Sequence, residues 1–152
     1  MSGQFVAGPV QAARGPFLEL GQEAWESMVG EVRSAFIGVR DYAREHEGPG
    51  RIVVVSCAAA ARPIGGATLE AVAGAFLTTA AQVAAVELAA RGITANVVLP
   101  ALEPDEVTVS AVVDFLLSDA AHGVSGAVIA ADGGFSITKE GTPSPLLELP
   151  EQ

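Results

Sequence analysis

Three side chains in the middle of the sequence could carry acid–base or nucleophilic chemistry: Ser56, Cys57 and Glu70. Glu70 stands at the start of an apolar segment, and burial there would raise the pKa of its carboxyl group. A carboxylate with a raised pKa can act as a general base on a keto compound, in an isomerisation, dehydration or cyclisation. The simpler interpretation is an acidic residue in a first helical turn, where the helix dipole stabilises it.

Cys57 and Ser56 directly follow a run of β-branched residues that ends at Val55. A cysteine there could be a nucleophile, but no base is near it in the sequence. This favours a small packing residue at the end of a strand. Ser56 is expected to hydrogen-bond the following loop rather than to react. Arg62, in that loop, could hold an anionic substrate, although an isolated surface arginine is the simpler interpretation.

The sequence offers no set of metal ligands. Its one cysteine and its two histidines, His46 and His122, lack ligand-like spacing, so we predict no metal site. Asp132 precedes two glycines, which is a turn signal, and alone it is not expected to bind a metal. A single cysteine excludes an internal disulfide, which fits a reducing compartment, and the predicted location is the cytoplasm.

These residues are spaced along alternating helical and strand patterns. Apolar residues at spacings of three and four predict helices at 22–46, 67–90 and 105–118. Continuous apolar runs predict strands that are covered on both faces, at 51–56, 94–99 and 127–131. Strands that alternate with helices indicate a parallel α/β sheet with helices on both faces and right-handed crossovers.

Composition narrows the possible partners. The 152 residues are 50% hydrophobic and 17% charged, with a formal net charge of -10. An acidic chain repels nucleic acid and anionic membranes, so neither is predicted as a partner. Residues 71–90 are long enough to span a membrane, but their alanines, polar residues and one glutamate favour a helix buried in protein. Residues 1–135 are predicted to form one domain, and the proline-containing residues 136–152 an extended arm.

Four segments form an ordered pattern over residues 17–135. They are FLEL at 17–20 with EAW at 23–25, GRIVVVSC at 50–57, ELAARGITANVV at 87–98, and SGAVIAADGG at 125–134. This ordered set resembles the C-terminal half of the short-chain dehydrogenase/reductase family. The resemblance implies a truncated Rossmann-like three-layer sandwich, with a short parallel sheet of three to four strands flanked by helices. Residues 5–8 would be the end of the additional strand.

The departures from the family pattern concern the cofactor and the chemistry. The glycine-rich turn that binds a dinucleotide pyrophosphate has no counterpart in this sequence, and the family's first half is expected to be absent. By counting from Glu87, the family's catalytic tyrosine and lysine fall on Glu70 and Gly74. Its catalytic serine falls on Cys57, and its asparagine on Val32. The resemblance therefore implies the fold without hydride transfer, and no cofactor is predicted.

The elements that are retained are those through which the family associates. In the family, the helices equivalent to 22–46 and 67–90 pack against their copies in a neighbouring subunit. We therefore predict a catalytically degenerate protein that acts as a homodimer, a higher oligomer or a partner of a full-length reductase. The alternative is a cofactor-independent enzyme with Glu70 as general base. The predicted interface residues are Trp25, Met28, Val32, Phe36, Ala71, Gly74, Ala75, Ala80 and Val83.

Overall fold

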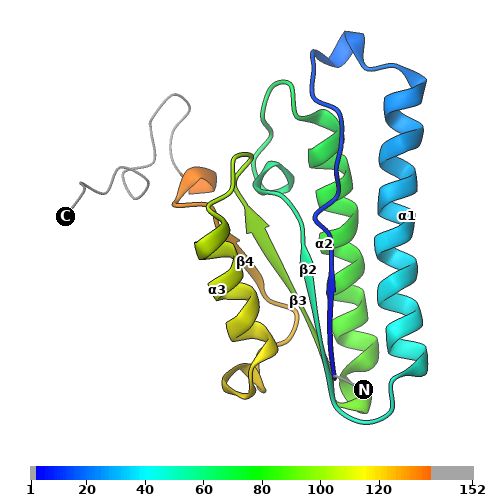
Figure 1. Ribbon diagram of the computed structural model, residues 1–152, viewed down its shortest axis with the longest axis vertical. Helices are drawn as coiled ribbons and strands as arrows, with labels where there is room; N and C mark the ends of the chain where they lie inside the picture. Colours follow the sequence, from blue (N-terminus) through cyan, green and yellow to red (C-terminus); the bar gives the residue numbers. More distant parts are fainter. Residues whose placement is uncertain (1–2, 138–152) are drawn as a thin grey trace, which may run out of the picture.

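The computed structural model describes residues 3–137, which form a single α/β unit (Figure 1). The strands are β1 (Gln4–Ala7), β2 (Gly50–Val55), β3 (Ile93–Pro100) and β4 (Val128–Ala131). The helices are α1 (Gln22–Glu45), α2 (Thr68–Leu88) and α3 (Glu106–Leu117). All three predicted helices and all three predicted strands are present within a few residues of the predicted bounds, and residues 4–7 form the additional strand.

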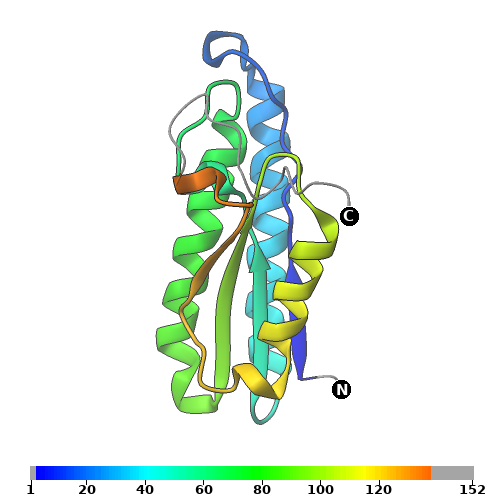
Figure 2. The ribbon, with the colours of Figure 1, turned by 90° about the vertical axis from the view of Figure 1, so that its left-hand side faces the viewer.

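The four strands form one parallel sheet in the order β1-β2-β3-β4. Helices α1 and α2 cover one face of the sheet and α3 covers the other, as Figures 1 and 2 show. This arrangement confirms the predicted Rossmann-like three-layer sandwich with a short parallel sheet. Because the strands are parallel, their carboxyl ends all meet at one edge, the upper end in Figure 1.

The central strand β2 explains why its sequence is continuously apolar. Ile52 and Val54 belong to the core on the α1 and α2 side, whereas Val53 belongs to the core beneath α3. All three side chains are at most 2% exposed. Successive residues of a strand point to opposite faces, so a strand with a helical layer on each side needs apolar residues at every position.

Local signals set the ends of the helices. Gly92 ends the turn after α2 with a φ of 72°, a left-handed conformation that favours glycine. At the start of α3, the Asp105 side chain accepts a hydrogen bond from the backbone N–H of Val107. Arg91 donates to the carbonyl oxygens of Ala43 and His46, which lie at the carboxyl end of α1. Arg91 thereby joins the ends of the two long helices.

Helix α2 continues into a short turn, and the combined segment Thr68–Arg91 is long and apolar enough to cross a membrane. The core helix of a globular protein passes the same test. Here the helix lies beside α1 and over the sheet, yet only 33% of its most apolar window is buried within the described part of the chain. Much of this apolar helix therefore faces outward.

The described chain ends in a turn over residues 132–137. Asp132 is buried, and its carboxylate accepts from the backbone N–H groups of Gly134 and Ser136. Arg62 donates to the carbonyl oxygen of Phe135 and stacks over its ring, so the interpretation of Arg62 as an isolated surface residue is wrong. The predicted domain boundary after residue 135 falls inside this turn, and the predicted arm beyond Ile137 lies outside the described residues.

Candidate functional site

The structure brings the three predicted reactive side chains together at the carboxyl end of β2. Ser56 and Cys57 follow β2 directly, and Glu70 lies in the first turn of α2. The three residues line one cavity with Val10, Ala73, Gly74 and Leu77. The cavity volume is about 10 Å³. A space of this size holds about one water molecule and no substrate.

Glu70 has a partner that the sequence did not reveal. Its carboxylate accepts from Nε and Nη2 of Arg14, at 2.9 Å and 3.0 Å. The same guanidinium donates to Glu103 Oε1 at 2.8 Å and to the carbonyl oxygen of Leu102 at 2.8 Å. The two acidic groups raise the pKa of Arg14, because hydrogen bonds to carboxylates favour its charged form. Arg14 is 56 residues from Glu70, and no local pattern links the two.

In the described chain, neither Ser56 nor Cys57 is hydrogen-bonded to a side chain that could act as its base. The Ser56 hydroxyl donates to the carbonyl oxygen of Gly74 in α2 at 3.0 Å, so it bonds the helix rather than the loop. Cys57 Sγ accepts from the backbone N–H of Ala59 at 3.4 Å and caps the short turn that follows. Burial raises the pKa of the Cys57 thiol, which opposes formation of the reactive thiolate at neutral pH.

Gly74 lies against the end of β2 with no room for a side chain. A Cβ atom added there would be 2.9 Å from Ser56 Oγ and 3.0 Å from the Cβ atom of Ala60. Real Cβ contacts are longer, so a larger residue would require Ser56, Ala60 or α2 itself to shift. The position that the family resemblance assigns to a lysine is therefore filled by close packing of helix and strand.

The outer face of α1 and α2 is different, because it exposes large apolar side chains. Phe76 is 49% exposed, and its ring meets that of Phe36 edge to face at 6.2 Å. The other large apolar side chains exposed on these helices are Trp25, Val72, Val83 and Val86. We call the surface formed by these six side chains the apolar face. Contiguous exposed patches of this kind are typical of interaction sites.

The predicted interface residues divide between this face and the core. Trp25, Phe36, Ala75 and Val83 are exposed, and Ala71 and Ala80 are half-buried. Met28 and Val32 are buried in the core and form the floor of a hollow between the helices, and Gly74 faces the sheet. A second, larger pocket of about 460 Å³ lies between the carboxyl halves of α1 and α2.

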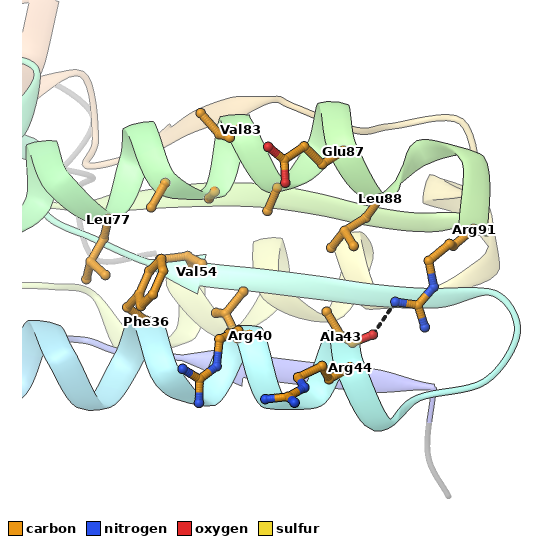
Figure 3. A pocket seen from close by; sticks show the side chains of 14 residues that line it. Phe36, Arg40, Ala43, Arg44, Val54, Leu77, Val83, Glu87, Leu88 and Arg91 are labelled. Carbon is orange, nitrogen blue, oxygen red and sulfur yellow. Dashed lines mark hydrogen bonds between the residues drawn. The ribbon is translucent and has the colours of Figure 1, made fainter.

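Figure 3 shows this larger pocket. Phe36, Leu77 and Leu88 point into the space between the helices, and Arg40 and Arg44 extend from α1 at its rim. Arg91 closes one end through its hydrogen bond to the Ala43 carbonyl oxygen. The largest open space among these sites is therefore between the helices and not at the carboxyl ends of the strands.

The described residues hold no group of three or more histidine, cysteine or acidic side chains that could bind a metal ion. His46 Nε2 lies 3.0 Å from the carbonyl oxygen of Pro49, and His122 lies at the end of the segment that follows α3. Asn96, fully buried in β3, bonds the carbonyl of Val124 and the N–H of Ala127. Asn96 therefore joins β3 to the segment that leads into β4.

A parallel sheet with helices on both faces and a polar cluster at the strand ends defines a Rossmann-like α/β protein. Residues 5–104 match the profile of a protein family described as enoyl-(acyl carrier protein) reductase. The chain belongs to the short-chain dehydrogenase/reductase family. Among curated protein sequences, none matches this chain significantly.

Solved structures agree with this assignment. A short-chain dehydrogenase/reductase from Serratia marcescens shares 28% identity over 88% of this chain, with a TM-score of 0.79. A short-chain type dehydrogenase/reductase from Mycobacterium ulcerans shares 28% identity over 90% of it, with a TM-score of 0.76. The reductase LugOII, which catalyses keto-reduction during lugdunomycin biosynthesis, shares the fold at 24% identity over 89% of the chain, with a TM-score of 0.82. This chain spans 65%, 61% and 60% of the three structures, respectively.

Proposed function

We propose that this chain is a catalytically degenerate member of its family, which acts through association with other subunits and not through hydride transfer. The observation that carries the proposal is the apolar face on α1 and α2, which nothing in the described chain covers. The residues at the positions that the resemblance assigns to the family's reaction also support degeneracy. Glu70 stands where the family resemblance puts a tyrosine, and Gly74 stands where it puts a lysine.

The residues at the strand ends do not fit a nicotinamide dinucleotide. Such a cofactor needs open space beside the reacting groups and, in this family, a cation beside the acid. The space beside Ser56 and Cys57 is about 10 Å³. The cation nearest to Glu70 is Arg14, whose guanidinium is bonded to the Glu70 carboxylate itself.

For the associating partner, a second copy of this chain is the simplest choice, and the charges of α1 support it. Residues 22–31 of α1 contain three glutamates and no basic residue, whereas residues 33–45 contain three arginines with one aspartate and one glutamate. Two α1 helices packed antiparallel would bring the acidic half of each against the half that carries the arginines. An obligate interface of this type typically buries about 2,000–5,000 Å².

The alternative, a cofactor-independent enzyme with Glu70 as general base, has less support. Glu70 accepts two hydrogen bonds from Arg14, so a substrate would have to displace that guanidinium before the carboxylate could take a proton. Mutation of Glu70 to Gln, with product formation in the host pathway as the measurement, tests this alternative directly.

Two measurements on the purified chain test the proposal. Light scattering is expected to give a mass at least twice the 15.4 kDa of one chain. Titration with NADPH or NADH is expected to leave the nicotinamide fluorescence unchanged. A stable 15.4 kDa monomer that recovers no partner from its host would contradict association. Recovery of a complete reductase would replace the second copy as the partner, and saturable micromolar cofactor binding would contradict degeneracy.

A further inference from the structure

The segment between β1 and α1 passes beside the carboxyl end of β2, where Ser56, Cys57 and Glu70 lie. We call residues 8–16 of this segment the strap. The strap contains no helix or strand, and its Val10 side chain lines the small cavity opposite Cys57. Its other end is tied by a backbone hydrogen bond from Gly15 N–H to the carbonyl oxygen of Gly66, at 2.9 Å. The strap therefore forms one wall of the cavity.

Arg14 is the main polar fastening of the strap. Its guanidinium joins three parts of the chain, since it bonds Glu70 at the start of α2 and both Leu102 and Glu103 in the loop after β3. The Glu70 side chain is 14% exposed, whereas those of Arg14 and Glu103 are 43% and 89% exposed. The inner pair is thus partly shielded from water, and the outer pair is at the surface, where ion pairs contribute little.

We propose that the strap is a closure that opens and closes over the strand ends, and that the Arg14–Glu70 ion pair holds it shut. Opening separates the Arg14 guanidinium from Glu70 and withdraws Val10 from the cavity, which uncovers Cys57, Ser56 and Glu70 together. Segments that open locally have few regular backbone hydrogen bonds and few buried side chains, and the strap has this character. This inference does not depend on the proposed association.

Cys57 provides a direct reporter, because it is the only cysteine in the sequence, is half-buried in the closed chain and lines the small cavity. The charges near Cys57 determine in which direction the reaction rate of its thiol changes when Arg14 is removed. Glu70 raises the pKa of the Cys57 thiol, and Arg14 lowers it. Removal of Arg14 therefore raises this pKa and reduces the thiolate fraction at a fixed pH. If nothing opened, the thiol of an Arg14 variant would react more slowly than that of the original chain.

The test is the rate at which Cys57 in the intact chain is alkylated by iodoacetamide, a neutral reagent, followed by mass spectrometry at pH 8. Arg14→Ala is expected to react about fivefold faster, because the closed state loses its partly shielded ion pair. Arg14→Lys keeps the charge but not the bidentate hydrogen bond. Its alkylation rate is expected to lie between those of Arg14→Ala and the original chain. The control is Glu103→Gln, which breaks only the exposed pair and is expected to stay within about twofold of the original chain.

An unchanged or slower rate in Arg14→Ala would overturn the proposal. Equal acceleration by Arg14→Ala and Glu103→Gln would also overturn it, because the inner pair would then have no special role. Circular dichroism shows whether each variant is folded. The alkylation rate of the chain in urea gives the rate for a fully unfolded chain, so opening of the strap alone should give a lower rate than this limit. If Arg14→Ala does not fold, the comparison of Arg14→Lys with Glu103→Gln decides in the same way.

Discussion

The carboxyl ends of the strands and the outer face of α1 and α2 differ in whether their side chains have partners within the chain. At the strand ends the polar groups of Ser56, Cys57 and Glu70 all have partners within the chain, and the remaining space is about 10 Å³. On the helices, large apolar side chains stay exposed beside a pocket of about 460 Å³. Ligands of open α/β sheets usually bind at the strand ends, and here that region is the closed one.

This difference shows that a shared fold does not by itself imply shared chemistry. The sheet and its helices match solved reductases closely, with a TM-score of 0.79 for the one from Serratia marcescens. The same scaffold here encloses a small cavity lined by internally paired residues at the carboxyl end of β2. A binding surface is therefore expected where apolar side chains remain exposed, on the outer face of α1 and α2. Each of the following predictions tests one side of this comparison.

The largest effect is expected from Gly74→Lys, which introduces the lysine that the family resemblance assigns to this position. Its Cβ atom would lie 2.9 Å from Ser56 Oγ and 3.0 Å from the Cβ atom of Ala60. We expect a loss of about 3 kcal/mol in the free energy of unfolding, more than the roughly 1 kcal/mol that replacing a helical glycine returns. Urea denaturation measures this change.

Gln82→Lys is the matched control, since Gln82 is exposed on the same helix. We expect its free energy of unfolding to stay within about 0.5 kcal/mol of the original chain. Equal stability of the two lysine variants would show that the strand ends have room for a side chain, and the contrast between the two regions would then fail.

The second effect concerns the apolar face. Phe76→Asp places a charge beside Phe36 at the centre of that face. If a second copy covers it, the dissociation constant should rise by at least about 30-fold, as for the loss of an interface hot spot. Sedimentation at several protein concentrations measures this. Val107→Asp on α3, a site that is exposed on the opposite side of the sheet, should leave the assembly unchanged.

A smaller effect is expected inside the closed region from Ser56→Ala. The variant removes the hydroxyl that donates to the buried carbonyl oxygen of Gly74. We expect a loss of about 1 kcal/mol in the free energy of unfolding, the usual net value of such a bond. Ser110→Ala, on the exposed side of α3, should change stability much less. Similar losses in both variants would show that the Ser56 bond contributes nothing particular.

The smallest effect is a dependence of stability on pH. Burial raises the pKa of Cys57 in the folded chain, so its proton is held more tightly there than in the unfolded chain. The stabilisation is complete below the ordinary thiol pKa and is lost as the pH rises through the raised value. The free energy of unfolding should therefore fall at alkaline pH, and Cys57→Ala should weaken this fall. Burial also raises the pKa of Tyr42, which adds a contribution that the variant retains.

Much of the fold could be predicted because its signals are local. The spacing of apolar residues in 22–46 predicts a helix with one face against the sheet. The β-branched run at 51–56 predicts a strand that is covered on both faces. Gly92 ends the turn after α2 through its own backbone freedom, which is also a local property of the sequence. The predicted strand at 94–99 extends by one residue at each end, because pairing with neighbouring strands, and not composition, sets where a ladder stops.

The candidate site was less predictable, because its decisive contacts join distant residues. Counting along the chain placed Glu70, Gly74 and Cys57 at family positions, but it gave no hint of Arg14, which is 56 residues away from Glu70. The role of Gly74 could not be found either, since close approach of a helix to a strand leaves no pattern in the sequence. Burial of Met28 and Val32 in the core likewise follows from the way α1 is rotated on the sheet.

The strand order β1-β2-β3-β4 also bears on how the chain reaches its fold during synthesis. Each strand pairs with the one made just before it, and no described strand inserts between two earlier ones. A ribosome delivering the chain from its N-terminus therefore supplies every new strand to an edge that already exists, with its crossover helix ready to cover it. Sequential addition avoids the wait for a late segment that long-range pairings impose.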